Sequence, residues 1–276
     1  MEEREFLICV KTYPEYSAKY IETVCTAAVL KDTGKLIRLY PIPYRYLVGD
    51  SQFRKYQWVR AKIQKNLRDG RPESYRVLKD SIQLGGSVGT QKGWLARRKL
   101  ILSQPGNLFG SLEDLQKSQE VNKTSLGIIK PRKIAGFKVQ KKTATELAEE
   151  EQKKRSIMAQ LSFAVEKKEL DLMPYRFLIS FACDHQACTG HNISILDWEF
   201  GQLYRNVMKS ANWEEKIKGK LEQICSKEKD VYFFMGNMAS RRNIFCILGI
   251  FYPPKIVEEQ LNLFTNQSAC SQRTDA

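Results

Sequence analysis

The chain has 276 residues, with 45 Lys+Arg against 31 Asp+Glu and a formal net charge of +14. Hydrophobic residues make up 42% of it, which is enough for a folded core and excludes a wholly disordered chain. The longest apolar run, residues 244–252, is far shorter than the ~20 residues of a membrane span, and the first residues are acidic where a secretory signal is basic. We therefore expect a soluble, cytoplasmic protein without a membrane partner.

The first half of the chain has the composition of a small mixed β structure, barrel-like in its strand content. Its apolar and β-branched residues gather in short runs bounded by turn residues, which is typical of strands. Gly34 lies between two such runs and predicts a β-hairpin, whereas the Gly-rich residues 85–89 predict a loop. The expected strands are residues 4–10, 22–30, 36–41, 56–63 and 124–139.

Helices are expected where helix-forming residues replace these runs. Residues 94–102 and 112–121 fit short helices, and Ser111 is the candidate N-cap of the second, with Asp114 in its first turn. Residues 143–158 contain neither Gly nor Pro and are rich in charge, which predicts an exposed helix. A domain boundary is therefore expected at or just after this helix.

The second half opens with an apolar strand at residues 175–183 and continues with two amphipathic helices. Ser194 and Asp197 fit the N-cap and N3 positions of a capping box, which starts the first helix. That helix is expected to reach about Lys209, and the second to run through residues 212–225, where apolar residues recur at helical spacing.

A β-hairpin and a polar tail complete the chain. Residues 231–235 and 244–252 are strand-like, and the polar residues 236–243 between them are expected to form the connecting loop. The chain is therefore predicted to be an α+β protein. Its expected parts are a basic mixed-β domain at 1–142, a connecting charged helix at 143–172, an α+β domain with a Cys/His knuckle at 173–265 and a loose tail at 266–276.

Positive charge is concentrated in one third of the chain. Residues 51–142 hold 21 Lys+Arg and 6 Asp+Glu, a net charge of +15, and the remainder has a net charge of −1. A segregated basic segment predicts a surface for a polyanion, because Lys and Arg neutralise phosphates and release counterions. Two arginines in the expected hairpin loop are further candidates for phosphate contact, with a solvated turn as the alternative. The predicted nucleic-acid-binding residues are Arg54, Lys55, Arg60, Arg97, Arg98, Lys99, Lys130, Arg132, Lys133, Arg241 and Arg242.

Aromatic residues are interleaved with this charge and allow two interpretations. Tyr56, Trp58 and Trp94 lie within a few residues of arginines and lysines, and Phe53 precedes Arg54. Exposed rings would stack on unpaired bases. Alternatively, the rings belong to the core and the basic residues form a solvated face.

Both histidines of the chain and two of its seven cysteines fall within nine residues. The four residues are Cys183, His185, Cys188 and His191, at the spacing C-x-H-x₂-C-x₂-H. Thiolate sulfur and imidazole nitrogen are the preferred zinc ligands, and structural sites use four of them, so this segment predicts a structural zinc knuckle. Because four ligands within nine residues is compact, a distant group in place of one of them is the alternative. The distant candidates are Cys225, Cys246 and Asp197.

No familiar enzyme motif accompanies these features. The sequence lacks G-x-x-x-x-G-K-[ST], H-E-x-x-H and G-x-S-x-G. We therefore predict a sequence-tolerant nucleic-acid-binding protein, for DNA or RNA, with a structural zinc. One alternative is a metal-dependent nuclease in which Asp197 and Glu199 are the catalytic candidates, since carboxylates near a metal can position water for phosphodiester attack. The other is a subunit that docks onto a larger nucleoprotein assembly through its basic face.

Overall fold

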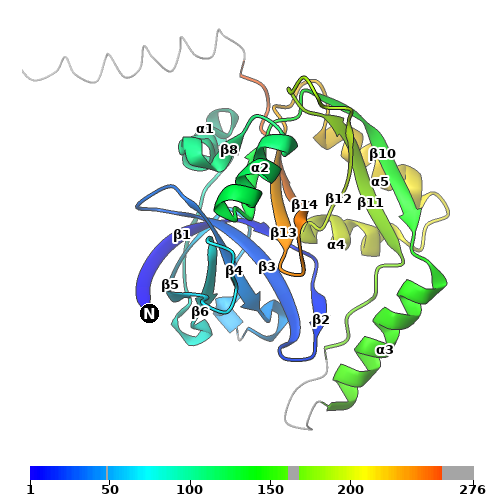
Figure 1. Cartoon of the computed structure of the whole chain (residues 1–276). Coiled ribbons are helices and arrows are strands. Elements are labelled where there is room, and N and C mark those ends of the chain that lie inside the picture. The colour runs from blue at the N-terminus through cyan, green and yellow to red at the C-terminus, as the bar shows by residue number, and fades with distance from the viewer. Residues whose placement is uncertain (48, 161–167, 257–276) are drawn as a thin grey trace, which may run out of the picture.

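The computed structural model of the protein, which describes residues 1–47, 49–160 and 168–256, begins with a closed five-stranded β-barrel (Figure 1). The long first strand pairs with two others, so the order β1-β3-β4-β6-β5 returns to β1 and leaves no open edge. The barrel strands are β1 (Glu2–Lys11), β3 (Ile21–Leu30), β4 (Leu36–Ile42), β5 (Gln57–Lys65) and β6 (Ser74–Val77). The short strands β2 (Glu15–Ser17) and β7 (Gln83–Ser87) extend from β3 and β5.

The apolar runs of the sequence account for this barrel. In β1, β3 and β4 the residues on both faces are largely buried, because one face fills the barrel and the other packs against the second half of the chain. Gly34, with φ of +67°, forms the tight turn of the predicted β3–β4 hairpin. The barrel interior includes Phe6, Ile8, Val24, Leu39, Val59 and Ile63.

The strand order of the barrel is that of an OB-fold. Counted within the barrel, the neighbours follow the order 1-2-3-5-4-1, and the third and fifth strands, β4 and β6, are parallel. In that fold the face of the second and third strands binds oligonucleotides and oligosaccharides. Here this face is covered by the second half: Val29 and Leu36 share an apolar cluster with Ile128. Arg38, with 2% of its surface exposed, donates to the carbonyl oxygen of Ser125 at 2.8 Å.

The second half contains most of the helices and two sheets, in which most neighbouring strands are antiparallel (Figure 1). One sheet has the order β10-β11-β12 and the other β14-β13-β9-β8. Their shared core includes Leu115, Ile179, Phe181, Phe200, Ile217, Phe233 and Ile247. The strands are β8 (Leu108–Phe109), β9 (Leu126–Ile129), β10 (Lys133–Lys141), β11 (Tyr175–Ala182), β12 (His191–Ser194), β13 (Tyr232–Met238) and β14 (Arg241–Phe251). The helices are α1 (Gln91–Leu102), α2 (Leu112–Asn122), α3 (Ala144–Gln160), α4 (Trp198–Val207) and α5 (Trp213–Ile224).

The predicted α+β class, with a small barrel in the first half, is confirmed. Ser111 caps α2 as predicted, since its side chain accepts the N–H of Asp114. The helix predicted at 143–158 is α3. The structure also pairs β9 with β13 and β10 with β11, across the boundary predicted at residue 142. The predicted tail at 266–276 lies outside the described residues.

Three local predictions are wrong. The loop at 85–89 is in part strand β7, which pairs with β5. The polar loop at 236–243 is mostly strand as well, because β13 extends to Met238 and β14 begins at Arg241. The N-cap of α4 is Asp197 rather than Ser194: Ser194 ends β12, and Asp197 accepts the N–H groups of Glu199 and Phe200.

None of the helices within 1–47, 49–160 and 168–256 is long and apolar enough to cross a membrane.

Candidate metal centre and nucleic-acid interface

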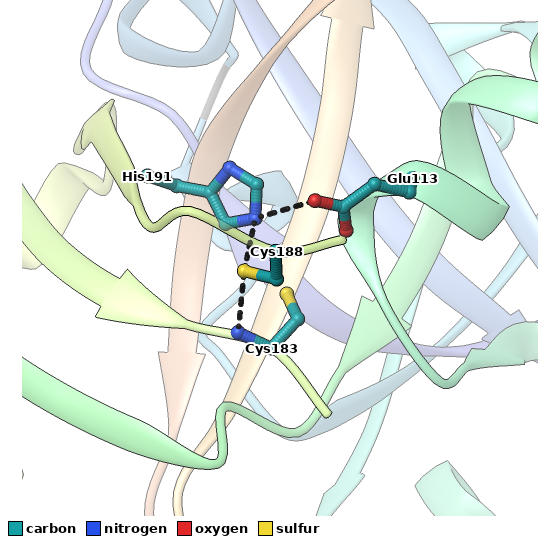
Figure 2. A group of neighbouring side chains, drawn as sticks. All are labelled: Glu113, Cys183, Cys188 and His191. Atoms are coloured by element: carbon teal, nitrogen blue, oxygen red, sulfur yellow. Dashed lines mark hydrogen bonds and ion pairs between the residues drawn. The ribbon is translucent and has the colours of Figure 1, made fainter. Parts of the chain in front are cut away.

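A short loop after β11 brings two thiols and an imidazole together (Figure 2). Cys183 directly follows β11, and His191 begins β12, paired with Phe181 across the two strands. Gly190, with φ of +99°, lets the chain turn back between them. The Cys188 sulfur lies 3.3 Å from His191 Nε2 and accepts the N–H of Cys183 at 3.2 Å.

Helix α2 supplies a fourth group to this cluster. Glu113 stands in the first turn of α2, and its Oε1 lies 3.3 Å from His191 Nε2 (Figure 2). The first backbone N–H of the same helix, from Leu112, points at the Cys183 sulfur at 3.4 Å. A helix N-terminus carries partial positive charge, so this contact favours the thiolate form of Cys183.

The metal group, Glu113, Cys183, Cys188 and His191, can hold a metal ion. Its four donor atoms lie within 4.8 Å of one another. Tetrahedral zinc with bonds of 2.0–2.3 Å needs ligand atoms roughly 3.3–3.8 Å apart, so small side-chain movements complete the shell. Glu113 Oε2 is buried and has no hydrogen-bond partner among the described residues, which leaves an acceptor for a cation. Burial raises the pKa of Cys183 to about 11, so a bound metal must displace its proton.

The metal group contains three of the four predicted ligands. His185 is exposed, and its Nδ1 accepts the N–H of Ala187 at 3.2 Å instead of facing the cluster. The fourth donor is distant in sequence, as the compact spacing suggested, but it is Glu113 and none of the candidates Cys225, Cys246 and Asp197. The one signal for Glu113 was its place in the first turn after the Ser111 cap, where an acidic residue has a helix-stabilising role of its own.

Asp197 and Glu199 belong to an ion-pair cluster between the barrel and the second half. Lys55 Nζ lies 3.2 Å from Asp197 Oδ2 and 3.2 Å from Glu199 Oε2. The side chains of Lys55 and Asp197 are each only 8% exposed. Burial would lower the pKa of Lys55, but the charges of Asp197, Tyr56 and Glu199 outweigh it and raise the pKa well above its usual value. The two predicted catalytic carboxylates thus lie outside the metal group.

The predicted nucleic-acid-binding residues are divided between internal contacts and the surface. Lys55 is buried in the cluster just described, and Arg98 donates to Asp230 at 2.8 Å and to the Pro254 carbonyl at 2.7 Å. Arg97 stacks 3.9 Å from the ring centroid of Tyr56 and donates to the Val88 carbonyl. The exposed members are Arg54, Arg60, Lys99, Lys130, Arg132, Lys133, Arg241 and Arg242.

The interleaved aromatic residues lie in the core or pack against it. Phe53 and Tyr56 are 1% and 6% exposed. Trp58 and Trp94 pack against the cluster that joins the barrel to the second half. The stacking hypothesis is therefore wrong for Phe53 and Tyr56, and the charge of these segments has to act through its exposed lysines and arginines.

Three exposed cations at the start of β10 and just before it form the knuckle patch, defined as Lys130, Arg132 and Lys133. Lys133 pairs with Ala182 across β10 and β11, and the backbone N–H of Arg132 donates to the Ala182 carbonyl at 2.9 Å. Because Ala182 is followed by Cys183, the patch is attached to the strand that carries the metal group. Lys130 also pairs with Asp230 at 2.6 Å.

A second group of exposed cations, the hairpin patch, comprises Lys65, Arg68, Arg241 and Arg242. It joins the loop between β5 and β6 to the turn between β13 and β14. A Cβ at Gly70 would lie 2.9 Å from Arg242 Nη2, so this guanidinium rests against the loop. The buried Arg71 ties the two together by donating to the Asn237 carbonyl at 2.8 Å.

Two family models match the chain. The first, described as a domain of unknown function (DUF8758), matches residues 2–103, and the second, described as a domain of unknown function (DUF8757), matches residues 108–268. The division falls between the end of α1 and the start of β8. No curated protein matches the sequence.

Proposed function

For this chain, which belongs to the DUF8757 family, we propose sequence-tolerant binding of nucleic acid through the knuckle and hairpin patches, with a zinc ion in the metal group. The observation that carries the proposal is the position of Arg132 and Lys133. Both are exposed, and neither has a salt-bridge partner in the part of the chain that the structure describes. Free cations at the start of β10, paired with the end of β11 next to the metal group, are suited to phosphates, which position a nucleic acid without reading its sequence.

Zinc is the metal that this donor set favours. Two cysteine sulfurs and one imidazole nitrogen suit zinc, whereas calcium and magnesium take oxygen ligands. Four protein ligands also close the shell, which is the arrangement of a structural site. Bound zinc would fix the start of α2 to the loop between β11 and β12 and so hold the knuckle patch in place. All six cysteines of the described ranges are free, which supports a cytoplasmic location.

The OB-fold topology gives this proposal only indirect support. The usual ligand face of such barrels is covered here, so binding has to use other surfaces. The loop between β5 and β6, which follows Lys65 and carries Arg68, corresponds to one of the two loops that OB-folds add to that face. The hairpin patch therefore extends an OB-fold binding loop with arginines from β14.

The test is a fluorescence-anisotropy titration of the full chain with labelled single- and double-stranded DNA and RNA of equal length, at several salt concentrations with magnesium present. In the double variant Arg132→Ala/Lys133→Ala we expect about tenfold weaker binding and a log–log salt slope shallower by about 2, because two phosphate contacts are lost. The matched control is Lys138→Ala/Lys141→Ala, which removes two exposed charges from the far end of β10.

Three results would overturn the proposal. Equal effects in the two double variants would mean that net charge alone is measured. Absence of binding to every probe would favour a subunit that docks onto another protein. Shortening of the probes would favour the nuclease alternative.

A further inference from the structure

A cavity of about 470 Å³ lies where the barrel meets the second half of the chain, next to α3. Its walls come from residues 12–16 of the barrel, from α3, from β11 and β14, and from the start of α4. The volume falls within the range of small-molecule sites, which form preferentially at such junctions. Residues 12–16 also belong to the connection between the first two barrel strands, the other loop that OB-folds use for ligands.

Aromatic side chains form part of the lining of this cavity. Tyr13, Tyr16 and Tyr175 line it together with Phe177 and Phe200. Tyr16 is fixed because its hydroxyl accepts the N–H of Leu170 at 2.8 Å, and Tyr13 donates to the Asp171 carbonyl at 3.1 Å. Phe177 and Phe200 pack edge to face with centroids 5.0 Å apart. Phe177, Phe200 and Tyr16 are core residues, so the half-buried rings of Tyr13 and Tyr175 are the ones that a planar ligand could contact.

Most charged groups around the cavity are already paired. Lys142 bonds Glu150 at 2.7 Å, and Arg205 bonds Asp171 at 2.7 Å. Arg176 pairs with Glu146 from α3.

Two cations and one carboxylate lining the cavity have no such pair. Within the described residues, neither Lys153 nor Arg241 has a salt-bridge partner, and both are exposed. The Glu15 carboxylate also lies there without a hydrogen bond from a described residue. Glu15 is exposed, so its carboxylate is open to a ligand. The cavity thus offers two cations for an anion and one carboxylate that accepts N–H groups.

We propose that this cavity binds a nucleotide, with the base against Tyr13 and Tyr175, its N–H groups on Glu15 and the phosphate on Lys153 and Arg241. This inference rests on the proposed function, since it takes the ligand class from it. The same chemistry is present in a free nucleoside monophosphate and in the terminal nucleotide of a strand.

The experiment is calorimetric titration of the full chain with AMP, GMP, CMP and UMP, with ribose 5-phosphate and glutamate as comparison ligands. We expect at least one nucleotide to bind more tightly than ribose 5-phosphate. Lys153→Ala and Arg241→Ala are each expected to weaken it about tenfold, as for a charge-assisted phosphate contact. The matched control is Arg155→Ala, which removes an exposed charge from α3 that pairs with Glu151 and does not line the cavity. Glu15→Ala is expected to reduce the preference for nucleotide over ribose 5-phosphate.

A 5′-phosphorylated oligonucleotide separates the two sources. Nucleotide binding that depends on Lys153 supports a free ligand, and oligonucleotide binding alone that depends on Lys153 supports a strand terminus. The inference is overturned if glutamate binds and nucleotides do not. It is also overturned if Lys153→Ala and Arg155→Ala change nucleotide affinity equally, or if no substitution changes the affinity for any ligand. The salt-slope test of the proposed function uses Arg132 and Lys133, neither of which lines the cavity, so the failure of either proposal is seen separately.

Discussion

The barrel and the second half hold themselves together by different means. In the barrel, β1 pairs with both β3 and β5, so backbone hydrogen bonds close the structure on themselves. The second half has two separate sheets, β10-β11-β12 and β14-β13-β9-β8, that share a core. The metal group connects the first of these sheets to helix α2, because Glu113 comes from α2 and the other three donors from the end of β11, the loop after it and the start of β12.

This difference implies that the two parts respond differently to loss of a single interaction. A closed ladder distributes its stabilisation over many bonds, each of which contributes about 1 kcal/mol net. A metal site concentrates it in one cluster, and metal-binding free energy is then folding free energy. The second half is therefore expected to be the part that a point change or a chelator can unfold.

The largest expected effect is that of metal removal. Treatment with EDTA, or the substitution Cys183→Ser, is expected to reduce bound zinc from one per chain to near zero and to destabilise the second half by several kcal/mol. Hydrogen–deuterium exchange should show loss of protection in β11, β12 and α2 and retained protection in β1 and β3. A purified protein that is fully folded without bound metal would contradict the expectation that the second half depends on a metal ion.

The next effect concerns the ion pair that joins the two parts. Asp197→Asn keeps an N-cap for α4 but leaves the buried Lys55 with only the exposed Glu199, so we expect a loss of about 3 kcal/mol in the free energy of unfolding. The double variant Lys55→Met/Asp197→Asn removes both charges and should recover most of this loss. Denaturant unfolding measures both, and a single variant as stable as the parent would show that the pair is not coupled to folding.

A smaller effect, on zinc affinity, distinguishes the residues expected to bind the metal from a neighbouring histidine that is not. Glu113→Ala is expected to weaken zinc binding by about 10–100-fold, in the range seen when groups that support a metal site are removed. His185→Ala is the matched control and should leave the affinity unchanged, because His185 faces away from the metal group. Competition with a zinc chelator gives both values. An equal loss of zinc affinity in the two variants would mean that His185 is also a ligand.

The three candidate metal donors that lie close together in the chain show what local spacing can predict. Cys183, Cys188 and His191 lie on a strand end and the turn that follows it, where the backbone fixes their separation. Glu113 is brought to them by the packing of α2, about seventy residues away in the chain, and no local pattern marks that contact. The hairpins and α2 were predictable for the same local reason, as alternating or periodic apolar residues next to turn and cap residues.

The basic residues show where local patterns fail. Lys55 and Arg98 are indistinguishable from their neighbours in sequence, but tertiary contacts with Asp197 and Asp230 place them inside. The N-cap of α4 was predicted three residues early because Ser194 and Asp197 are both good caps. Pairing of Ser194 with Leu178 in the sheet decides between them. Charge composition therefore predicted a class of partner, whereas the tertiary structure determines which charges can reach it.

The smallest effect tests the contact that joins the loop before β6 to β13. Burial alone would raise the pKa of Asp69, but hydrogen bonds from Arg71 and Ser74 outweigh it and lower the pKa to about 2. A carboxylate whose pKa is lower in the folded than in the unfolded protein stabilises the fold at pH values above its unfolded pKa of about 4. This stabilisation is lost as the pH falls from about 4 to 2. Allowing for solvent screening, we expect a loss of about 1–2 kcal/mol over that range.

The substitution Asp69→Asn isolates this contribution from other acid-labile groups. In that variant the difference in stability from the parent should be largest above pH 4 and vanish near pH 2, measured by denaturant unfolding at each pH. Asp80→Asn removes an exposed carboxylate nearby in the chain and should show no such pH-dependent difference. Because Arg71 also donates to the Asn237 carbonyl, the loss should extend to protection of β13, which lies beyond the barrel. Loss confined to the barrel would mean that the loop and the hairpin patch are energetically independent.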